Sequence, residues 1–215
     1  MASLPNGSTF FIATAFAAVI PFTAITNGVD PVVTATAHGL ANGDIVEVTS
    51  GWGRLSRRAF RVKTVAANTF ALEGVNTTNL SFFPAGSGVG SVRKVSTFVQ
   101  ITQTMNPSSS GGEAKKVTYK YTEDDNEQTI NDGFSPTSRT LDIDADAIST
   151  AGYIALRDLT DVQTNTVLKT QTKNGSFTLL GCTVALNEEV AYQDGQINRV
   201  KVEFSGNSKS VRYAS

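Results

Sequence analysis

The sequence is short of the residues from which most catalytic and metal sites are built. Its 215 residues include one cysteine, Cys182, and one histidine, His38. A single cysteine excludes an internal disulfide and a cysteine zinc site. A single histidine leaves His-dependent catalysis without a second partner. We therefore expect no catalytic constellation, no metal site and no cofactor, and we predict that the chain is not an enzyme.

Charge is scarce as well. Charged residues make up 17% of the chain, and 18 basic against 19 acidic residues give a net charge of -1. Such a chain has no global electrostatic attraction to nucleic acid or to an anionic membrane. The apolar run 10–22 contains Pro21 and is shorter than the roughly 20 residues that span a bilayer. The first basic residue is Arg54, so this run also lacks the positive region of a secretory signal. We interpret it as a strand or arm that packs against protein.

The chain is rich in Thr, Ser, Asn and Gly, and its apolar residues alternate with polar ones. Alternation of this kind predicts antiparallel strands with one covered and one solvated face. The clearest cases are Val117, Tyr119 and Tyr121, and later Val200, Val202 and Phe204. The runs 92–104 and 177–186 are predicted as further long strands. The expected fold is mainly β, an antiparallel β-sandwich or barrel with one packed α-helix and a small inserted all-β module.

Three zones differ in pattern. A short N-terminal arm at 1–22 and a long C-terminal zone at 96–215 are predicted to form one discontinuous domain. Residues 23–95 are predicted to form an inserted small β module, with strands at 32–37, 45–49, 60–65 and 69–73. The Gly/Ser stretch 86–91 that closes this module resembles a flexible linker.

One helix is expected, at about 144–159. Its apolar stripe consists of Ile148, Ala151, Ala155 and Leu159. The acids Asp142, Asp144 and Asp146 crowd its start, where free N–H groups and the helix dipole favour carboxylates. A calcium loop is the competing interpretation, but the positions that should hold Gly and Glu hold Ala147 and Tyr153, so capping is favoured. Gly152 in the interior weakens the helix prediction.

Four further features have a structural and a functional interpretation. The acidic cluster 123–127 is a solvated turn or, less simply, an acid–base or metal site. His38 is expected to be a hydrogen-bonded structural residue, and Cys182 a small core residue. Trp52, between two glycines, is a contact anchor in an exposed loop or a residue packed within the module.

The third zone resembles the tail tube proteins of long, non-contractile-tailed bacteriophages, the lambda-type family. A long strand ends in Met105-Asn106-Pro107 and is followed by a polar loop, the strand 115–122, a Gly133-Phe134-Ser135 turn and the segment 139–143. The helix with Ala155-Leu156-Arg157-Asp158-Leu159 and a closing hairpin from 177 to 204 complete the order. The resemblance lies in element order and texture rather than in one motif.

The second zone resembles the small β module first described as an insertion in ubiquitin-activating enzymes. The string runs from Asp30-Pro31-Val32-Val33 through residues 37–44 to Phe60-x-Val62 and Asn68-Thr69-Phe70-x-Leu72. The module carries no catalytic residues in that setting, so the resemblance implies a fold and no ubiquitin chemistry. Lambda-type tubes usually carry an extra domain at the C-terminus, and the placement here departs from that pattern.

These resemblances imply a structural virion protein, made in the cytoplasm of a host bacterium. Six-fold rings of it would stack into the phage tail tube, the conduit through which DNA is ejected. Its partners would be copies of itself, the tape measure, the tail terminator and the baseplate or tip, without specific DNA binding and without a membrane. The alternative is an adhesion module of a phage or cell surface. The assembly state discriminates between the two.

The resemblance also suggests where contacts would lie. Candidate inter-ring residues are Asn106, Pro107, Ser108, Ser109, Ser110, Gly111, Gly112 and Glu113. Candidate acids of the tube lumen are Glu123, Asp124, Asp125 and Glu127. The inserted module is expected on the outer wall, where its exposed contact candidates are Trp52, Arg54, Arg57 and Arg58.

Overall fold

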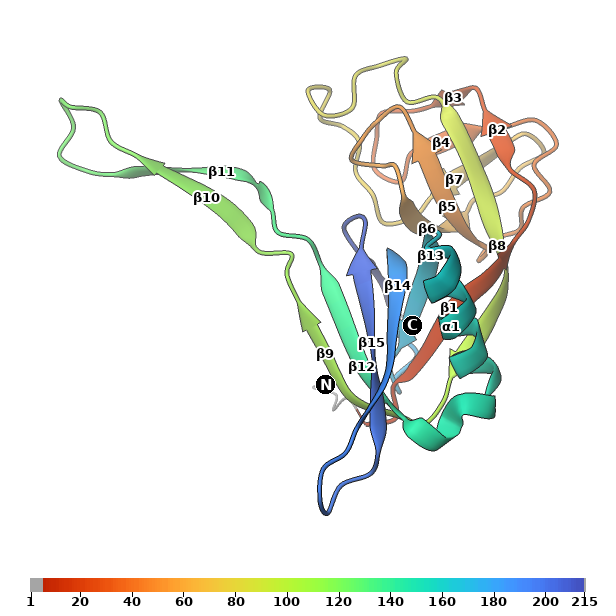
Figure 1. The fold of residues 1–215 in the computed structure, drawn as a ribbon. Helices are drawn as coiled ribbons and strands as arrows, with labels where there is room; N and C mark the ends of the chain where they lie inside the picture. The colour runs from red at the N-terminus through yellow and green to blue at the C-terminus, as the bar shows by residue number, and fades with distance from the viewer. Residues whose placement is uncertain (1–5, 215) are drawn as a thin grey trace.

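The computed structural model describes residues 6–214, and strands dominate it (Figure 1). The first seven strands are short and follow one another closely. They are β1 (Thr9–Phe16), β2 (Ile20–Phe22), β3 (Ala24–Ile25), β4 (Val32–Thr34), β5 (Ile45–Ser50), β6 (Arg58–Lys63) and β7 (Thr69–Leu72). The four strands predicted between residues 32 and 73 are confirmed as β4 to β7, with ends that differ by up to three residues.

The C-terminal part contains longer strands and the helical segments. They are β8 (Gly90–Ile101), β9 (Thr104–Ser110), β10 (Ala114–Tyr119), β11 (Gln128–Phe134), β12 (Ser138–Asp144), a 3-10 turn η1 (Ala145–Ser149), α1 (Ala151–Val162), β13 (Thr166–Gln171), β14 (Phe177–Ala191), β15 (Arg199–Gly206) and β16 (Val211–Tyr213). The single extended strand expected over 92–104 is divided between β8 and β9, because Gln103 adopts a left-handed backbone with φ of 55°.

Fourteen strands form one antiparallel sheet that curls into a half-barrel, and this confirms the predicted fold class. Its main order is β3-β4-β7-β6-β5-β8-β1-β13-β14-β15-β12-β9. The apolar run 10–22 supplies β1, which pairs with β8 on one side and β13 on the other. Among residues 6–214, no helix is long and apolar enough to cross a membrane.

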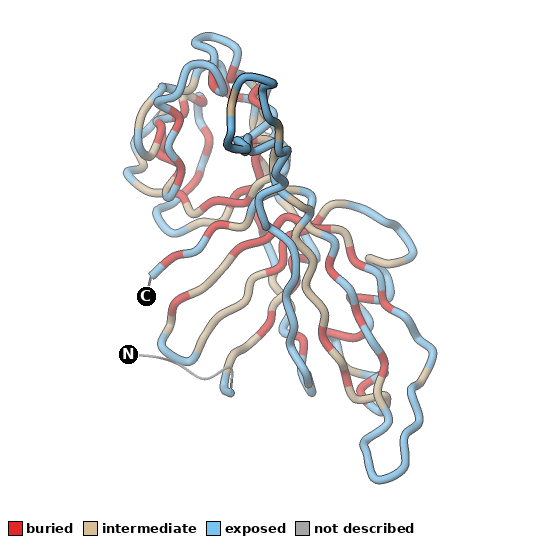
Figure 2. Tube along the Cα trace, turned by 90° about the vertical axis from the view of Figure 1, so that its left-hand side faces the viewer, coloured by how far each residue is buried: buried red, intermediate tan, exposed pale blue. Residues whose placement is uncertain are grey.

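The core of the half-barrel follows directly from strand alternation. In β15, Val200, Val202 and Phe204 are buried while Lys201 and Glu203 between them are exposed. These side chains pack with residues of β12 and β14 and with the helix. Buried stretches in Figure 2 lie along these strands and in the module above them. The prediction of one covered and one solvated face is therefore confirmed for β15.

The helix begins later than predicted, and of the predicted stripe only Ala155 and Leu159 pack against the core. Ala145–Ser149 form the 3-10 turn, which Asp144 caps by accepting the Asp146 N–H, and Thr150 caps the α-helix that follows. Ile148, predicted in the apolar stripe, is 56% exposed because it belongs to the 3-10 turn. The buried residues of α1 are Gly152, Tyr153 and Leu156.

The module and the half-barrel share a core. One apolar cluster draws most of its members from residues 13–95. It also contains four residues from the C-terminal part, namely Val167, Leu179, Val211 and Tyr213. The Tyr213 hydroxyl donates to the carbonyl of Glu73 at 2.9 Å and accepts the N–H of Arg61 at 2.9 Å. Strand β8 pairs with β5 in the module and with β1 in the half-barrel. The division into a discontinuous domain 1–22 and 96–215 and a module 23–95 stays a prediction about folding units.

The Gly/Ser stretch 86–91 is part of this packed structure, so the expectation of a flexible linker is wrong. Gly90 and Ser91 are the first residues of β8. A Cβ on Gly88 would lie 2.4 Å from Ile25 Cγ2 and 2.7 Å from a ring carbon of Trp52. Glycine is needed here because the chain passes close to buried side chains. Composition alone does not separate this use of glycine from flexibility.

Candidate assembly interface

A two-stranded arm, residues 111–136, projects from the half-barrel (Figure 1). Strands β10 and β11 pair only with each other and form a sheet of their own. The register places Val117 opposite Ile130 and Thr118 opposite Thr129. Two-stranded ribbons are marginally stable alone in water. An arm of this kind therefore gains stability when another surface covers it.

The base of the arm is built on two consecutive glycines. Gly111 and Gly112 have φ of 80° and 78°, a backbone that disfavours other residues. A Cβ on Gly111 would lie 1.8 Å from the carbonyl oxygen of Pro136. Across the base, the Gly112 N–H donates to Ser135 O at 3.1 Å and the Ser135 N–H donates to Glu113 O at 2.9 Å. The two ends of the arm are thus neighbours, and the glycines fix its direction.

One face of the arm carries exposed apolar side chains. Val117 is 52% exposed, and Ile130 opposite it is 57% exposed. Tyr121 is 54% exposed, while Phe134 near the base pairs with Ala114, and its ring centroid lies 5.7 Å from Lys209 Nζ. The alternation at 117–121 was predicted to have one covered face, and that is wrong within this chain because the ribbon stands clear of the half-barrel. Exposed apolar side chains grouped in this way indicate an interaction surface.

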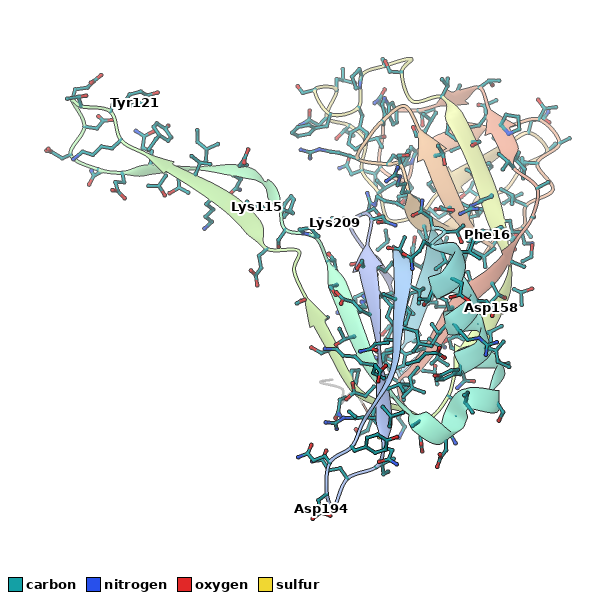
Figure 3. The ribbon with its side chains drawn as sticks, in the orientation of Figure 1. Phe16, Lys115, Tyr121, Asp158, Asp194 and Lys209 are labelled. Carbon is teal, nitrogen blue, oxygen red and sulfur yellow. The ribbon has the colours of Figure 1, made fainter. Side chains whose placement is uncertain are left out.

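The tip of the arm, residues 120–127, is acidic. It holds Glu123, Asp124, Asp125 and Glu127, none of which forms an ion pair within the described chain. The turn is closed by the Asp124 N–H, which donates to Tyr121 O at 3.1 Å. Figure 3 places Tyr121 at this far end, distant from Lys209 and the body of the protein. The cluster is therefore a solvated turn within the chain.

The predicted inter-ring residues divide between a strand and the arm. Asn106–Ser110 belong to β9, in which Ser108, Ser109 and Ser110 pair with β12. The expectation of a polar loop from Ser108 to Glu113 is therefore wrong for its first half. Asn106 Nδ2 donates to Asp142 Oδ2 at 2.9 Å. Gly111, Gly112 and Glu113 form the base of the arm. Serine-rich sequence favours a loop, but pairing with β12 overrides the weak strand propensity of serine.

Strand β9 ends the main sheet, and its outer edge has no partner strand among the described residues. Unpaired strand edges present backbone N–H and C=O groups to any strand of another chain. This edge runs directly into the base of the arm. The open edge and the exposed arm therefore form one continuous surface.

The four contact candidates of the module have different environments. Trp52 is 1% exposed, its Nε1 donates to Pro84 O at 2.8 Å, and its ring packs edge-on against Phe83, so the prediction that it is exposed is wrong. The gap left by Gly88 lets its indole pack inside the module. Arg54 is exposed and stacks over Phe82 at 3.3 Å.

Arg57 and Arg58 lie where the module meets the half-barrel. Arg57 is exposed, and its carbonyl accepts a hydrogen bond from Ser208 Oγ at 2.9 Å. Arg58 is partly buried, and its Nε donates to Lys209 O at 3.3 Å. Burial lowers the pKa of the Arg58 guanidinium. Arg58 thus links the module to the half-barrel through this hydrogen bond.

The two residues singled out for chemistry have structural surroundings. His38 is 5% exposed, with Nε2 2.9 Å from Ala66 O, and its Nδ1 accepts the Leu40 N–H at 3.1 Å. Cys182 lies in the core of the half-barrel, and burial raises the pKa of its thiol to about 12. The expectations of a structural histidine and a core cysteine are confirmed. Within the described residues no group of three or more metal-ligating side chains occurs.

An edge-open, curled β-sheet with a projecting apolar arm defines a structural protein that associates with other chains. The family model described as phage tail tube protein, TTP, matches residues 50–215. No curated protein matches this chain. The chain belongs to the phage tail tube protein family, and its place is in the tail of the virion. The match begins at the end of β5, so it spans the second half of the module and strands β8 to β16.

Proposed function

We propose that this protein polymerises as six-membered rings that stack into the phage tail tube, the conduit for DNA ejection into the host. The observation that supports this proposal is the exposed apolar face of the arm. The arm exposes Val117 and Ile130, which lie opposite each other on β10 and β11. Within a stack, the arm of one ring lies against the next ring and buries this face, with Gly111–Glu113 at the start of the contact.

Ring closure is proposed to use the open sheet edge. A strand of a neighbouring copy would pair with β9 along Asn106–Ser110, which supports a heterologous contact repeated around the ring. Closing the sheets of all copies into one barrel removes every open edge. The same edge in a monomer would promote uncontrolled association.

The tube is proposed to pass DNA without holding it. Each basic contact to phosphate releases counterions and slows passage, so the lumen should be neutral or acidic. The near balance of 18 basic and 19 acidic residues supports this. Glu123, Asp124, Asp125 and Glu127 at the arm tip are the proposed lumen acids. Submicromolar binding of double-stranded DNA at low salt contradicts this part of the proposal.

Residues 23–95 are proposed to lie on the outer wall of the tube, since a body in the lumen obstructs DNA. Arg54 and Arg57 are its exposed contact candidates. The likeness to the insertion of ubiquitin-activating enzymes rests on the string from Asp30 to Leu72 and stays a prediction. The proposed partners are further copies, the tape measure, the tail terminator and the baseplate or tip, after synthesis in the host cytoplasm.

A matched pair of arm variants tests the function. Val117→Asp places a charge on the apolar face, and Thr118→Asp places the same charge one residue away on the opposite face. Both positions are exposed, so both proteins should fold with the circular dichroism spectrum of the parent. We expect Val117→Asp to abolish sedimentable tubes and Thr118→Asp to retain them. Equal assembly of both variants contradicts the role given to the arm.

A further inference from the structure

A cavity of about 230 Å³ opens at the seam of the half-barrel, between β1 and β9. These two strands come from opposite ends of the six-strand run β1-β13-β14-β15-β12-β9. Five hydroxyl-bearing residues line the cavity together with Arg139 and apolar residues such as Leu168; they are Ser8, Ser108, Ser109, Thr170 and Thr178. A cavity rich in hydroxyls with one guanidinium is suited to an anionic group.

Arg139 stands where the strand pattern calls for an apolar residue. It shares a face of β12 with Leu141 and Ile143, which are 2% and 1% exposed, and it is itself only partly exposed. Burial lowers the pKa of its guanidinium. Its only side-chain hydrogen bond to residues 6–214 runs from Nη1 to Thr170 Oγ1 at 2.7 Å. A guanidinium has five N–H donors and can bind a carboxylate with two of them, whereas this one has only a hydroxyl as side-chain partner.

No such carboxylate pairs with Arg139 within the described chain. The arm tip has an excess of negative charge, because residues 123–127 contain four acids that form no ion pair within the described chain. The tip of the same chain cannot supply the partner. From Ala114 to Asp124 the extended arm spans ten residues, or roughly 33 Å at about 3.3 Å each. The tip thus stands far from the Arg139 of its own chain (Figure 3).

We propose that the seam pocket around Arg139 receives a carboxylate from the acidic arm tip of a second copy of this chain. This inference rests on the proposed stacking and names the site on the receiving ring. An ion pair in a hydroxyl-lined pocket is stronger than one in water, and it fixes the register of the contact. Acids spaced around a turn face more than one direction, so one carboxylate enters the pocket while others face the lumen.

Arg139→Met is the first test because methionine keeps much of the apolar stem and removes the charge. The unassembled protein should unfold at the same temperature or higher, since no ion pair within the chain is lost. The concentration needed for assembly should rise about tenfold or more, as for loss of one partner of a buried ion pair. If the unassembled variant is instead destabilised while assembly is unchanged, the pocket serves the same chain and the proposal is overturned.

A disulfide between copies tests the contact directly. Ser109→Cys at the pocket mouth and Asp125→Cys at the tip are combined in a Cys182→Ala background. Oxidised tubes should give a ladder of cross-linked chains on a non-reducing gel, because a disulfide requires Cα atoms within about 7 Å. Ser109→Cys with Asp161→Cys, on exposed α1, should give none. Tubes that form normally without the first ladder overturn the pocket assignment alone, whereas absence of tubes in the parent protein overturns the proposed function.

Discussion

Gly152 is the position at which two opposing effects can be separated by one substitution. Replacing glycine with alanine in a helix interior stabilises the helix by about 1 kcal/mol, and Gly152, the second residue of α1, gains at most this amount. Here a Cβ would lie 2.5 Å from the carbonyl oxygen of Gln100 and 2.9 Å from Cα of Ile101. Both are backbone atoms of β8, held at this point by pairing with Phe10 and Phe11 of β1, so they cannot turn away as a side chain would. The helix must move outward instead.

Moving α1 loosens Tyr153 and Leu156, which are buried against the half-barrel. Overpacking of this kind typically destabilises a protein by about 1–3 kcal/mol. A clash with backbone atoms should cost about 3 kcal/mol, because the backbone cannot move aside easily. After subtraction of the propensity gain, Gly152→Ala should destabilise the protein by about 2 kcal/mol. The steric cost therefore outweighs the helix preference.

Urea denaturation of the unassembled protein measures this difference. The midpoint should fall with an unchanged slope, and it should not depend on protein concentration. Asp161→Ala, at an exposed position in the same helix, is the control. It gains propensity without a clash and should stabilise by about 0.5 kcal/mol. A Gly152→Ala protein that is more stable than the parent refutes the close contact of α1 with β8.

Three further outcomes follow from burial and charge. Val202→Asp should prevent folding, with a loss of about 4 kcal/mol or more, because a carboxylate replaces a fully buried side chain; Lys201→Ser beside it should fold normally, and circular dichroism compares the two. The Cys182 thiol, with its pKa raised to about 12 by burial, should react with a thiol reagent at about pH 8 only after unfolding; rapid labelling of native protein contradicts its placement. The hydrogen bond from Arg61 lowers the pKa of the Glu73 carboxyl in the folded protein. This hydrogen bond therefore stabilises the fold fully above the unfolded-state pKa of about 4.3, and the stabilisation is lost as the pH falls through the folded-state pKa. Glu73→Gln should therefore lower the urea midpoint at about pH 7 and have little effect at about pH 2, and an equal loss at both contradicts this.

The strands of the module and the half-barrel could be predicted because period-two alternation is a local property of the sequence. Val200, Val202 and Phe204 share one face whatever packs on it, and the core then selects that face. The same reasoning failed at Val117 and Tyr121. Alternation says that a strand has two faces, and it does not say whether the same chain covers either of them.

Glycine and tryptophan were the other residues whose surroundings could not be predicted from the local sequence. The stretch 86–91 has the composition of a linker, but Gly88 is packed against Ile25 and Trp52. Trp52 lies between two glycines, a setting typical of loops, and the sequence alone does not decide between an exposed contact anchor and a packed residue. The loop is present, but the Trp52 indole points inward, and its Nε1 donates a hydrogen bond to the carbonyl oxygen of Pro84. Contacts between residues distant in sequence decide such cases, and local patterns do not contain them.

The identity of the seam pocket also lay beyond the sequence. Arg139 follows a polar turn and resembles an ordinary surface arginine, and only the pairing of β12 with β15 and β9 places it on the core face. The acidic cluster at 123–127 was visible from the sequence, but its position at the end of a projecting arm was not. Its relation to Arg139 therefore depends on the fold.

Negative-stain imaging of the purified parent protein over a range of concentrations tests the central claim most directly. The proposal predicts rings at low concentration and stacked tubes of uniform diameter at high concentration, because the open edge of β9 and the exposed arm are covered only in an assembly. Protein that is folded by circular dichroism and remains monomeric at every concentration and salt condition would contradict it.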